Sequence, residues 1–159
     1  MSKLRFQKLF ILVVIFFCLT LTLGCKMNSN VIYTYSDGSG NTYIINSTGE
    51  KSLEYNPVKP HSSSSGTYDG GDYRKIKISE SQYKKIVSNF NKAASNKKNQ
   101  IENRVMGSGL IIIQENENKT KYILKPGSPE QLELEKTLKE ILKMGTYINF
   151  LSQCTFMYI

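Results

Sequence analysis

The side chains that could do chemistry in this chain are few, and their arrangement argues against most kinds of catalytic site. His61 is the only histidine, so sites built on two histidines, including helical H-E-x-x-H zinc centres, are excluded. The chain also has no G-x-S-x-G motif that would present a nucleophilic serine. Cys154 lies in an apolar segment without an activating neighbour, which is typical of an inert thiol.

Two clusters of oxygen-bearing side chains have the residue types of ligand or acid/base sites. The segment 37–41 (DGSGN) has the alternating oxygens of a calcium loop, but Thr42 and Thr48 replace the glycine and glutamate that an EF-hand needs, so a hairpin turn is favoured. Asp69 and Asp72 lie in a glycine-rich loop without the fixed separation that paired carboxylates need. We therefore expect no catalytic residue, no metal and no cofactor, and a carboxylate hydrolase is the least favoured alternative.

The amino terminus has the organisation of an export signal. Three basic residues, Lys3, Arg5 and Lys8, precede an uncharged apolar run from Leu9 to Leu23. A helix of that length reaches only about 22 Å, which is short of the roughly 30 Å hydrocarbon core of a bilayer. A cleaved signal is therefore favoured over a permanent membrane span.

The segment 21–25 (LTLGC) resembles the lipobox of bacterial lipoproteins, and it departs from the commonest pattern only at Thr22, where leucine is usual. The resemblance implies that residues 1–24 are removed and that Cys25 carries a diacylglycerol and an acylated amine, which together give stable membrane anchoring. Cys18 would then leave with the signal, Cys154 would be the single free thiol, and removal of three basic residues would lower the net charge from +8 to +5.

The exported part has the size and composition of one domain, with a tether at 25–30 and a folded region at 31–145. The whole chain has 159 residues, of which 40% are hydrophobic and 21% charged. Two β-rich segments separated by the 37–41 turn predict a hairpin, and a third strand is plausible at 51–55. Residues 56–72, rich in serine, glycine and proline, predict a long mobile loop that is either functional or a linker.

The second half of the domain predicts a helix, a hairpin and another helix. Ser79 and Gln82 fit a capping box ahead of a helix that runs to about Ser95. We expect a strand at 101–114 with a bend at 107–109, pairing with a strand at 120–125. Ser128, Pro129 and Gln131 predict the start of a second helix, which Gly145 should end.

The predicted order β-β-(β)-loop-α-β-β-α favours an α+β fold, in which an antiparallel sheet of about five strands carries two helices on one face. The uncharged, apolar residues 146–159 are interpreted as a final strand or a tail folded over the core. An alternative is that the residues after about Lys143 are not the original ending of the domain.

Positive charge is concentrated between Arg74 and Arg104, where nine basic residues face two acidic ones. A solvated helix face explains this pattern most simply. The functional alternative is a surface for anionic lipid, an anionic glycan or an acidic protein. Nucleic acid is not expected as a partner because the protein is predicted to be exported. The residues assigned to this surface are Arg74, Lys75, Lys77, Lys84, Lys85 and Lys92.

These observations predict a non-catalytic binding or structural protein that a lipid on Cys25 anchors in the bacterial cell envelope. The alternative hypothesis is an inhibitor or immunity-type lipoprotein, which would bind a toxin or hydrolase through the 56–72 loop. No family resemblance covers residues 26–159.

Overall fold

The computed structural model describes the backbone of residues 30–63 and 65–155 and, within these ranges, the side chains up to Gly145. The predicted signal, Cys25, most of the tether and residues 156–159 lie outside the described residues. None of the helices in the described part has the length and apolar character that a membrane span requires.

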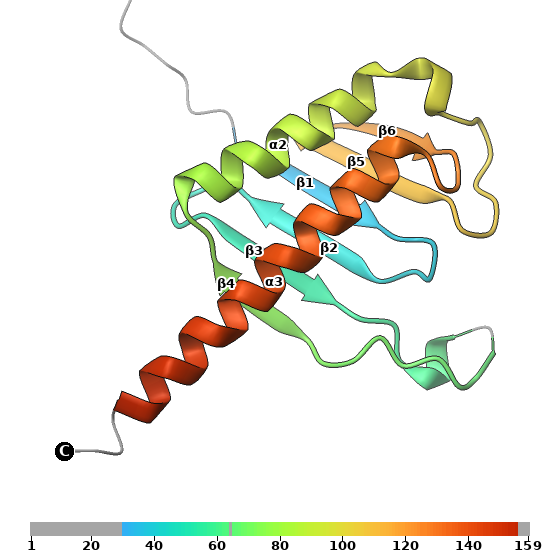
Figure 1. The fold of residues 1–159 in the computed structure, drawn as a ribbon. Coiled ribbons are helices and arrows are strands. Elements are labelled where there is room, and N and C mark those ends of the chain that lie inside the picture. The colour runs from blue at the N-terminus through green and yellow to red at the C-terminus, as the bar shows by residue number, and fades with distance from the viewer. Residues whose placement is uncertain (1–29, 64, 156–159) are drawn as a thin grey trace, which may run out of the picture.

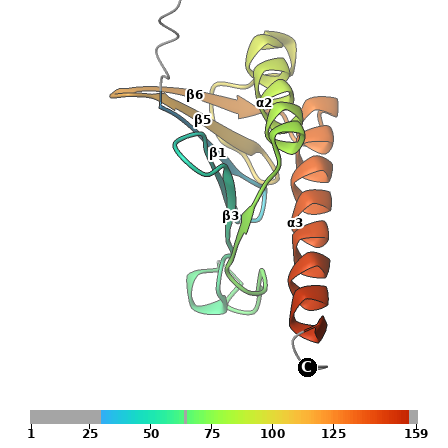
Figure 2. The same cartoon turned by 90° about the vertical axis from the view of Figure 1, so that its left-hand side faces the viewer.

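A single antiparallel sheet of six strands, in the order β4-β3-β2-β1-β5-β6, forms the body of the molecule (Figure 1). Two helices, α2 and α3, pack on the same face of this sheet, and none of the described α-helices covers the opposite face, which is called the helix-free face below (Figure 2). The predicted α+β class is therefore confirmed. The strands are β1 (Val31–Ser36), β2 (Thr42–Asn46), β3 (Ser52–Asn56), β4 (Arg74–Lys77), β5 (Gly109–Glu115) and β6 (Asn118–Leu124), and the helices are α2 (Glu80–Ser95) and α3 (Pro129–Thr155).

The strand that the sequence analysis missed is β4, which follows the 56–72 loop and forms one edge of the sheet. Ile76 is buried there and pairs directly with Leu53 of β3. A strand of four residues with three basic side chains shows only one buried position, so its alternation is too short to be recognised from the sequence.

The core lies between the sheet and the two helices, because every second strand residue points toward them. Tyr33, Ile45 and Leu53 are among the buried strand residues, and they meet Ile86 and Phe90 of α2 in one hydrophobic cluster. The rings of Tyr33 and Phe90 lie 5.2 Å apart between centroids. Leu134, Leu138, Ile141 and Leu142 supply the corresponding face of α3.

Both helices begin where the sequence predicted, but their first turns are hydrogen-bonded differently. At α2 the predicted capping box is confirmed, since Ser79 Oγ accepts from the backbone N–H of Gln82 and the Gln82 side chain accepts from the backbone N–H of Ser79. Helix α3 begins at Pro129, as predicted, but the buried Ser128 Oγ has no hydrogen-bond partner in the described part of the chain. Gln131 donates to Gly107 O and to Glu135 instead.

Gly145 does not end α3, which continues through Thr155. A Cβ atom at Gly145 would lie 2.8 Å from Ile76 Cδ1, so the missing side chain lets the helix approach β4 closely. The predicted stop was therefore a packing position. Residues 146–155 are helical rather than a final strand.

The predicted strand at 101–114 begins only at Gly109, and residues 101–108 form an irregular segment. Ser108 closes a turn in it, because its Oγ donates to Val105 O at 2.6 Å and its backbone N–H donates to the same oxygen at 3.0 Å. This segment lies against the β1–β2 turn, where a Cβ atom at Gly38 would be 2.7 Å from Gly107 Cα. The close contact places residues from both segments at one end of the sheet.

Candidate functional site

A row of aromatic side chains crosses the helix-facing side of the sheet. Tyr35 of β1 pairs with Tyr43 of β2, Tyr43 with Tyr55 of β3, and Tyr55 with Arg74 of β4. Neighbouring rings lie 6.1 Å and 5.0 Å apart between centroids. Since directly opposed residues share a face, this register places Arg74 at the end of the row.

Tyr35 connects the row to helix α3 through the carboxylate of Glu135. The Tyr35 hydroxyl donates to Glu135 Oε1 at 2.7 Å, Gln131 Nε2 donates to the same oxygen at 3.0 Å, and Lys139 Nζ lies 3.2 Å from Oε2. Burial raises the pKa of Glu135, but the hydrogen bonds from Gln131, Tyr35 and Lys139 together hold this pKa below its ordinary value. Glu135 is therefore an ionised carboxylate with three donors.

The β1–β2 turn is organised by Asp37, which is 5% exposed. Its Oδ1 accepts from the backbone N–H groups of Ser39 and Asn41 at 2.9 Å each, and its Oδ2 accepts from Asn41 Nδ2 at 2.9 Å. The hairpin turn predicted for this segment is thus confirmed. Both carboxylate oxygens of Asp37 accept hydrogen bonds from groups within the turn. In the described part of the chain, no group of three or more histidine, cysteine or acidic residues is placed to hold a metal ion.

The loop between β3 and β4 is fastened to this turn. Asn41 Nδ2 donates to the Tyr68 hydroxyl at 2.8 Å, and Asn41 Oδ1 accepts from the backbone N–H of Val58 at 3.0 Å. The Tyr55 hydroxyl donates to Gly70 O at 2.7 Å, and Gly70 N–H donates to Val58 O at 2.9 Å. Hydrogen bonds therefore hold the base of the loop near both of its ends.

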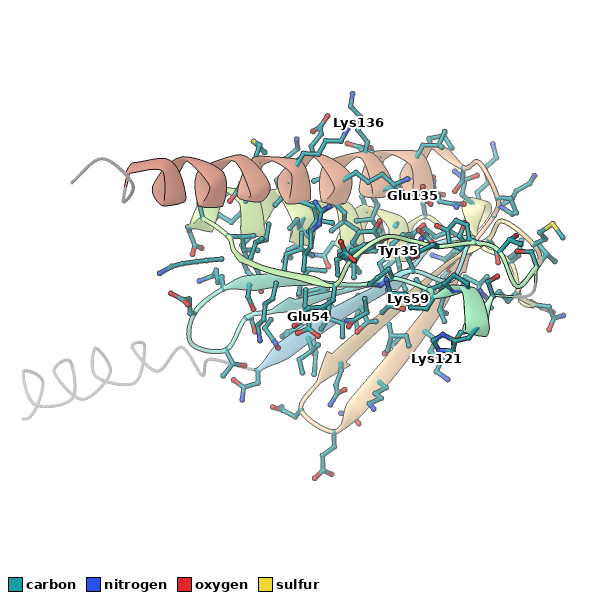
Figure 3. The ribbon with its side chains drawn as sticks, turned by 90° about the horizontal axis from the view of Figure 1, so that it is seen from below. Tyr35, Glu54, Lys59, Lys121, Glu135 and Lys136 are labelled. Atoms are coloured by element: carbon teal, nitrogen blue, oxygen red, sulfur yellow. The ribbon has the colours of Figure 1, made fainter. Side chains whose placement is uncertain are left out.

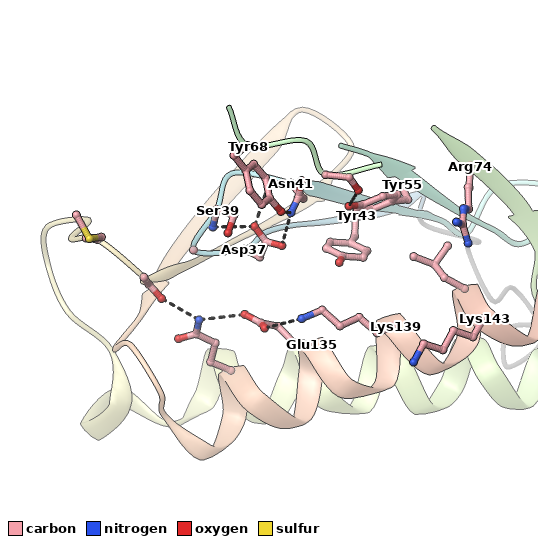
Figure 4. A pocket seen from close by; sticks show the side chains of 16 residues that line it. Asp37, Ser39, Asn41, Tyr43, Tyr55, Tyr68, Arg74, Glu135, Lys139 and Lys143 are labelled. Carbon is pink, nitrogen blue, oxygen red and sulfur yellow. Dashed lines mark hydrogen bonds and ion pairs between the residues drawn. The ribbon is translucent and has the colours of Figure 1, made fainter. Parts of the chain in front are cut away.

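A cleft of about 580 Å³ lies between this turn, the loop, the tyrosine row and α3 (Figure 4). The Tyr43 hydroxyl points into the cleft and makes no hydrogen bond to any described residue. Burial, followed by the nearby charge of Asp37, raises the pKa of Tyr43 well above its ordinary value, so the hydroxyl stays neutral. Tyr68, 38% exposed, forms part of the rim.

Three cationic side chains line the cleft, namely Arg74, Lys139 and Lys143. Figure 4 shows Arg74 extending from β4 toward α3, which carries both lysines. Glu135 and Asp37 are the acidic residues in the lining, so the cleft has a net positive charge. Lys139 is paired with Glu135, whereas Lys143 has no acidic partner among the described residues.

The six basic residues predicted to form one surface are distributed over three places. Arg74 lines the cleft. Lys75 and Lys77 alternate with it along β4 and therefore point to the helix-free face of the sheet. The α2 lysines lie near glutamates, with Lys84 Nζ 3.9 Å from Glu80, Lys85 Nζ 3.8 Å from Glu140 and Lys92 Nζ 2.6 Å from Glu133. All these α2 pairs are substantially exposed, and such pairs add little to stability.

Sequence reasoning missed the residues that define the cleft: Tyr43, Glu135, Lys139 and Lys143. One signal was available, because tyrosines at corresponding positions of successive β-rich segments predict a row across a sheet. The contribution of α3 had no such signal, since the pairing of Glu135 with Tyr35 joins residues 100 positions apart.

Comparison of the chain with protein-family models, with curated proteins and with solved structures found no match.

Proposed function

We propose that this chain is a lipid-anchored protein of the bacterial cell envelope whose domain binds an anionic ligand in the cleft and performs no catalysis. The observation that carries the binding proposal is the lining of the cleft, which combines a neutral tyrosine hydroxyl, aromatic rings and an excess of cationic side chains. Its volume of about 580 Å³ suits a small molecule or one group of a larger partner.

The ionisable groups of the cleft are arranged for binding rather than for proton transfer. A general acid or base needs a pKa near the working pH and an open position for the substrate. The pKa of Glu135 is lowered, and its oxygens are occupied by three donors. Asp37 is occupied by its own turn. Neither carboxylate therefore has the properties of an acid/base catalyst.

The cationic groups suit a ligand that carries a carboxylate or a phosphate. Arg74 presents a planar guanidinium that can bind such a group with two parallel hydrogen bonds, and Lys143 adds a point charge from the opposite wall. Tyr43 and Tyr68 offer hydroxyls and ring surface to the remainder of the ligand. A sugar acid or a phosphorylated sugar has both kinds of group.

The cleft proposal is tested by titrating the protein with a panel of sugar acids, sugar phosphates and their neutral parent sugars, with NMR detection. We expect charged members to shift the signals of Tyr43 and Tyr68 more than their neutral parents do. Arg74→Gln should remove this preference, and Lys136→Gln on the outer face of α3 is the matched control (Figure 3). Unshifted cleft signals across the panel, or equal binding by Arg74→Gln, would contradict the proposal.

The anchor proposal rests on the lipobox-like segment 21–25 and on the apolar run before it. Metabolic labelling with an alkyne fatty acid should give a labelled protein, and Cys25→Ala should lose the label. Cys154→Ser is the control because it removes a thiol outside the signal. Unchanged incorporation in Cys25→Ala would refute the anchor.

A second candidate function is inhibition of a toxin or hydrolase. It is favoured by the hydrogen bonds that join the 56–72 loop to Asn41 and Tyr55. Hydrogen bonds at its base reduce the entropy that the loop would lose on entering a partner's cleft. Co-purification distinguishes the two functions. A stoichiometric protein partner that is lost in Tyr68→Phe/Asn41→Ala supports inhibition, whereas a retained small anionic molecule supports the cleft proposal.

A further inference from the structure

The helix-free face of the sheet has a regular distribution of charge. Two cross-strand rows run over it from edge to edge and end on lysines at both sides. The strand register sets one row as Lys75, Glu54, Ile44, Thr34, Ile112 and Lys121, and the next as Lys77, Ser52, Asn46, Ile32, Gln114 and Lys119.

The middle of these rows is apolar or uncharged, and the four lysines stand at the rims. Ile32, Ile44 and Ile112 are each half-buried, while the lysines are exposed. With strands about 4.8 Å apart, the lysine pairs on β4 and β6 are separated by roughly 24 Å. Figure 3 shows Glu54 and Lys121 on the side of the sheet that faces away from α3.

Positive charge on this face exceeds negative charge. Lys75 Nζ lies 3.8 Å from Glu54, and Lys77 pairs with Glu50 in the adjoining turn. Lys119 and Lys121 form no ion pair with any described residue. An uncharged centre that includes three isoleucines, bordered by lysines, suits contact with anionic lipid, because the ammonium groups can reach headgroups beside the uncharged contact.

The attachment point of the predicted anchor is close to these rows along the chain. Cys25 precedes the first residue of β1 by six positions, so an extended tether spans at most about 20 Å. Ile32 and Thr34, near the start of β1, are the members of the two rows on that central strand. A lipid on Cys25 would therefore keep the lysine rows within reach of the headgroups.

We propose that the helix-free face of the sheet, with Lys75, Lys77, Lys119 and Lys121 at its rims, docks on an anionic membrane surface. The inference rests on the proposed lipid anchor and adds an orientation to it: the sheet faces the bilayer and the helices face away. Each lysine beside an anionic surface contributes about fivefold to the docked fraction. Replacing Lys119 and Lys121 should therefore lower the ratio of docked to undocked protein roughly 25-fold.

The test uses the full lipidated chain in vesicles of phosphatidylcholine, with and without phosphatidylglycerol. In a Cys154→Ser background, a fluorophore is attached at Thr34→Cys in the centre of the face or at the exposed Ser88→Cys on α2. Ser52→Cys in the neighbouring row is a second reporter if the Thr34 variant folds poorly. Quenching by brominated lipids measures the approach of each position to the bilayer.

We expect strong quenching at Thr34→Cys in vesicles that contain phosphatidylglycerol, and weak quenching at Ser88→Cys. Lys119→Gln/Lys121→Gln should remove most of the Thr34→Cys signal, as should high salt. Lys98→Gln/Lys136→Gln, with the same loss of charge elsewhere, should leave it unchanged. Lysines on edge strands also prevent the sheets of two molecules from pairing edge to edge. Size-exclusion chromatography therefore checks that Lys119→Gln/Lys121→Gln does not aggregate.

Flotation of the protein with the vesicles separates the two proposals. Protein that floats through Cys25 but shows equal or absent quenching at Thr34→Cys and Ser88→Cys would overturn the docking inference and leave the anchor intact. Protein that does not float would overturn the proposed lipid anchor, and with it the proposed orientation of the sheet on the bilayer.

Discussion

The two faces of the sheet are built from the same strands but differ in burial, charge and hydrogen bonding. On the helix-facing side, Tyr35, Ile45 and Leu53 are fully buried and belong to the core. Their strand neighbours on the other side, including Thr34 and Ile44, are half-buried, and no α-helix of the described residues covers them. One face therefore carries the stability of the fold, and the other is free to interact with a surface.

The same comparison distinguishes how charge is used. The carboxylate of Glu135 on the helix-facing side is held by three donors in a half-buried site. The lysines of the opposite face are exposed, and two of them, Lys119 and Lys121, have no acidic partner within the described residues. The charge of Glu135 therefore holds neighbouring side chains in place, whereas the charges of Lys119 and Lys121 on the helix-free face remain available to a partner.

Truncating neighbouring isoleucines gives the largest expected contrast between the faces. Ile45→Ala should lower the free energy of unfolding by about 2–5 kcal/mol, because it leaves a cavity in the core. Ile44→Ala should cost about 1 kcal/mol or less, since its side chain is only half-buried. Chemical denaturation measures both, and equal losses would contradict the assignment of the core to one face.

Alkaline titration should destabilise the helix-facing side through its buried phenols. Burial raises the pKa values of Tyr35 and Tyr43 above those of the unfolded chain, and the charge of Asp37 and, for Tyr35, the hydrogen bond to Glu135 raise them further. Their contribution is therefore fully present below pH 10, roughly the pKa of an unfolded tyrosine, and is lost as pH rises. The loss should be about 1.4 kcal/mol per buried tyrosine for each pH unit above that value.

Denaturant titrations between pH 9 and pH 11 measure this slope. Tyr43→Phe should reduce the slope by the contribution of one proton, whereas Tyr73→Phe, at a position that is 55% exposed, should leave it unchanged. The same slope in all three proteins would show that the row is not the source of the alkaline sensitivity.

Removing the Tyr35 hydroxyl tests the link between the row and α3. Tyr35→Phe should cost about 2 kcal/mol, because a half-buried carboxylate loses a donor. Tyr33→Phe is the matched control, since the Tyr33 hydroxyl bonds to no described residue. The pKa of Glu135, followed by NMR, should rise in Tyr35→Phe and stay unchanged in Tyr33→Phe.

The smallest expected effect is on the helix-free face. Lys119→Gln/Lys121→Gln should change the free energy of unfolding by less than about 0.5 kcal/mol, because both side chains are exposed. Thermal melting without lipid measures this. A large loss of stability would mean that these lysines serve the fold, and it would weaken their assignment to a membrane surface.

Local signals in the sequence predicted the elements whose stabilising contacts are themselves local. The capping box of α2 joins residues three positions apart, and the β1–β2 turn is closed by Asp37 and Asn41 within four positions. Both were predicted correctly. Ser128 and Pro129 likewise predicted where α3 begins, but the Gln131 side chain bonds to Gly107, 24 positions away, and no local pattern predicted that contact.

The sequence by itself determined the α+β class, the two helix positions and the paired strands, because alternation and helical periodicity are properties of adjacent residues. Only the tertiary structure decided that Gly145 is a packing position rather than a stop, that Arg74 faces Lys139 and Lys143 across a cleft, and that lysines of β4 and β6 end the same rows. Each of these depends on the order of strands in the sheet and on the crossing of α3 over it. Such contacts join residues distant in sequence, and no local pattern encodes them.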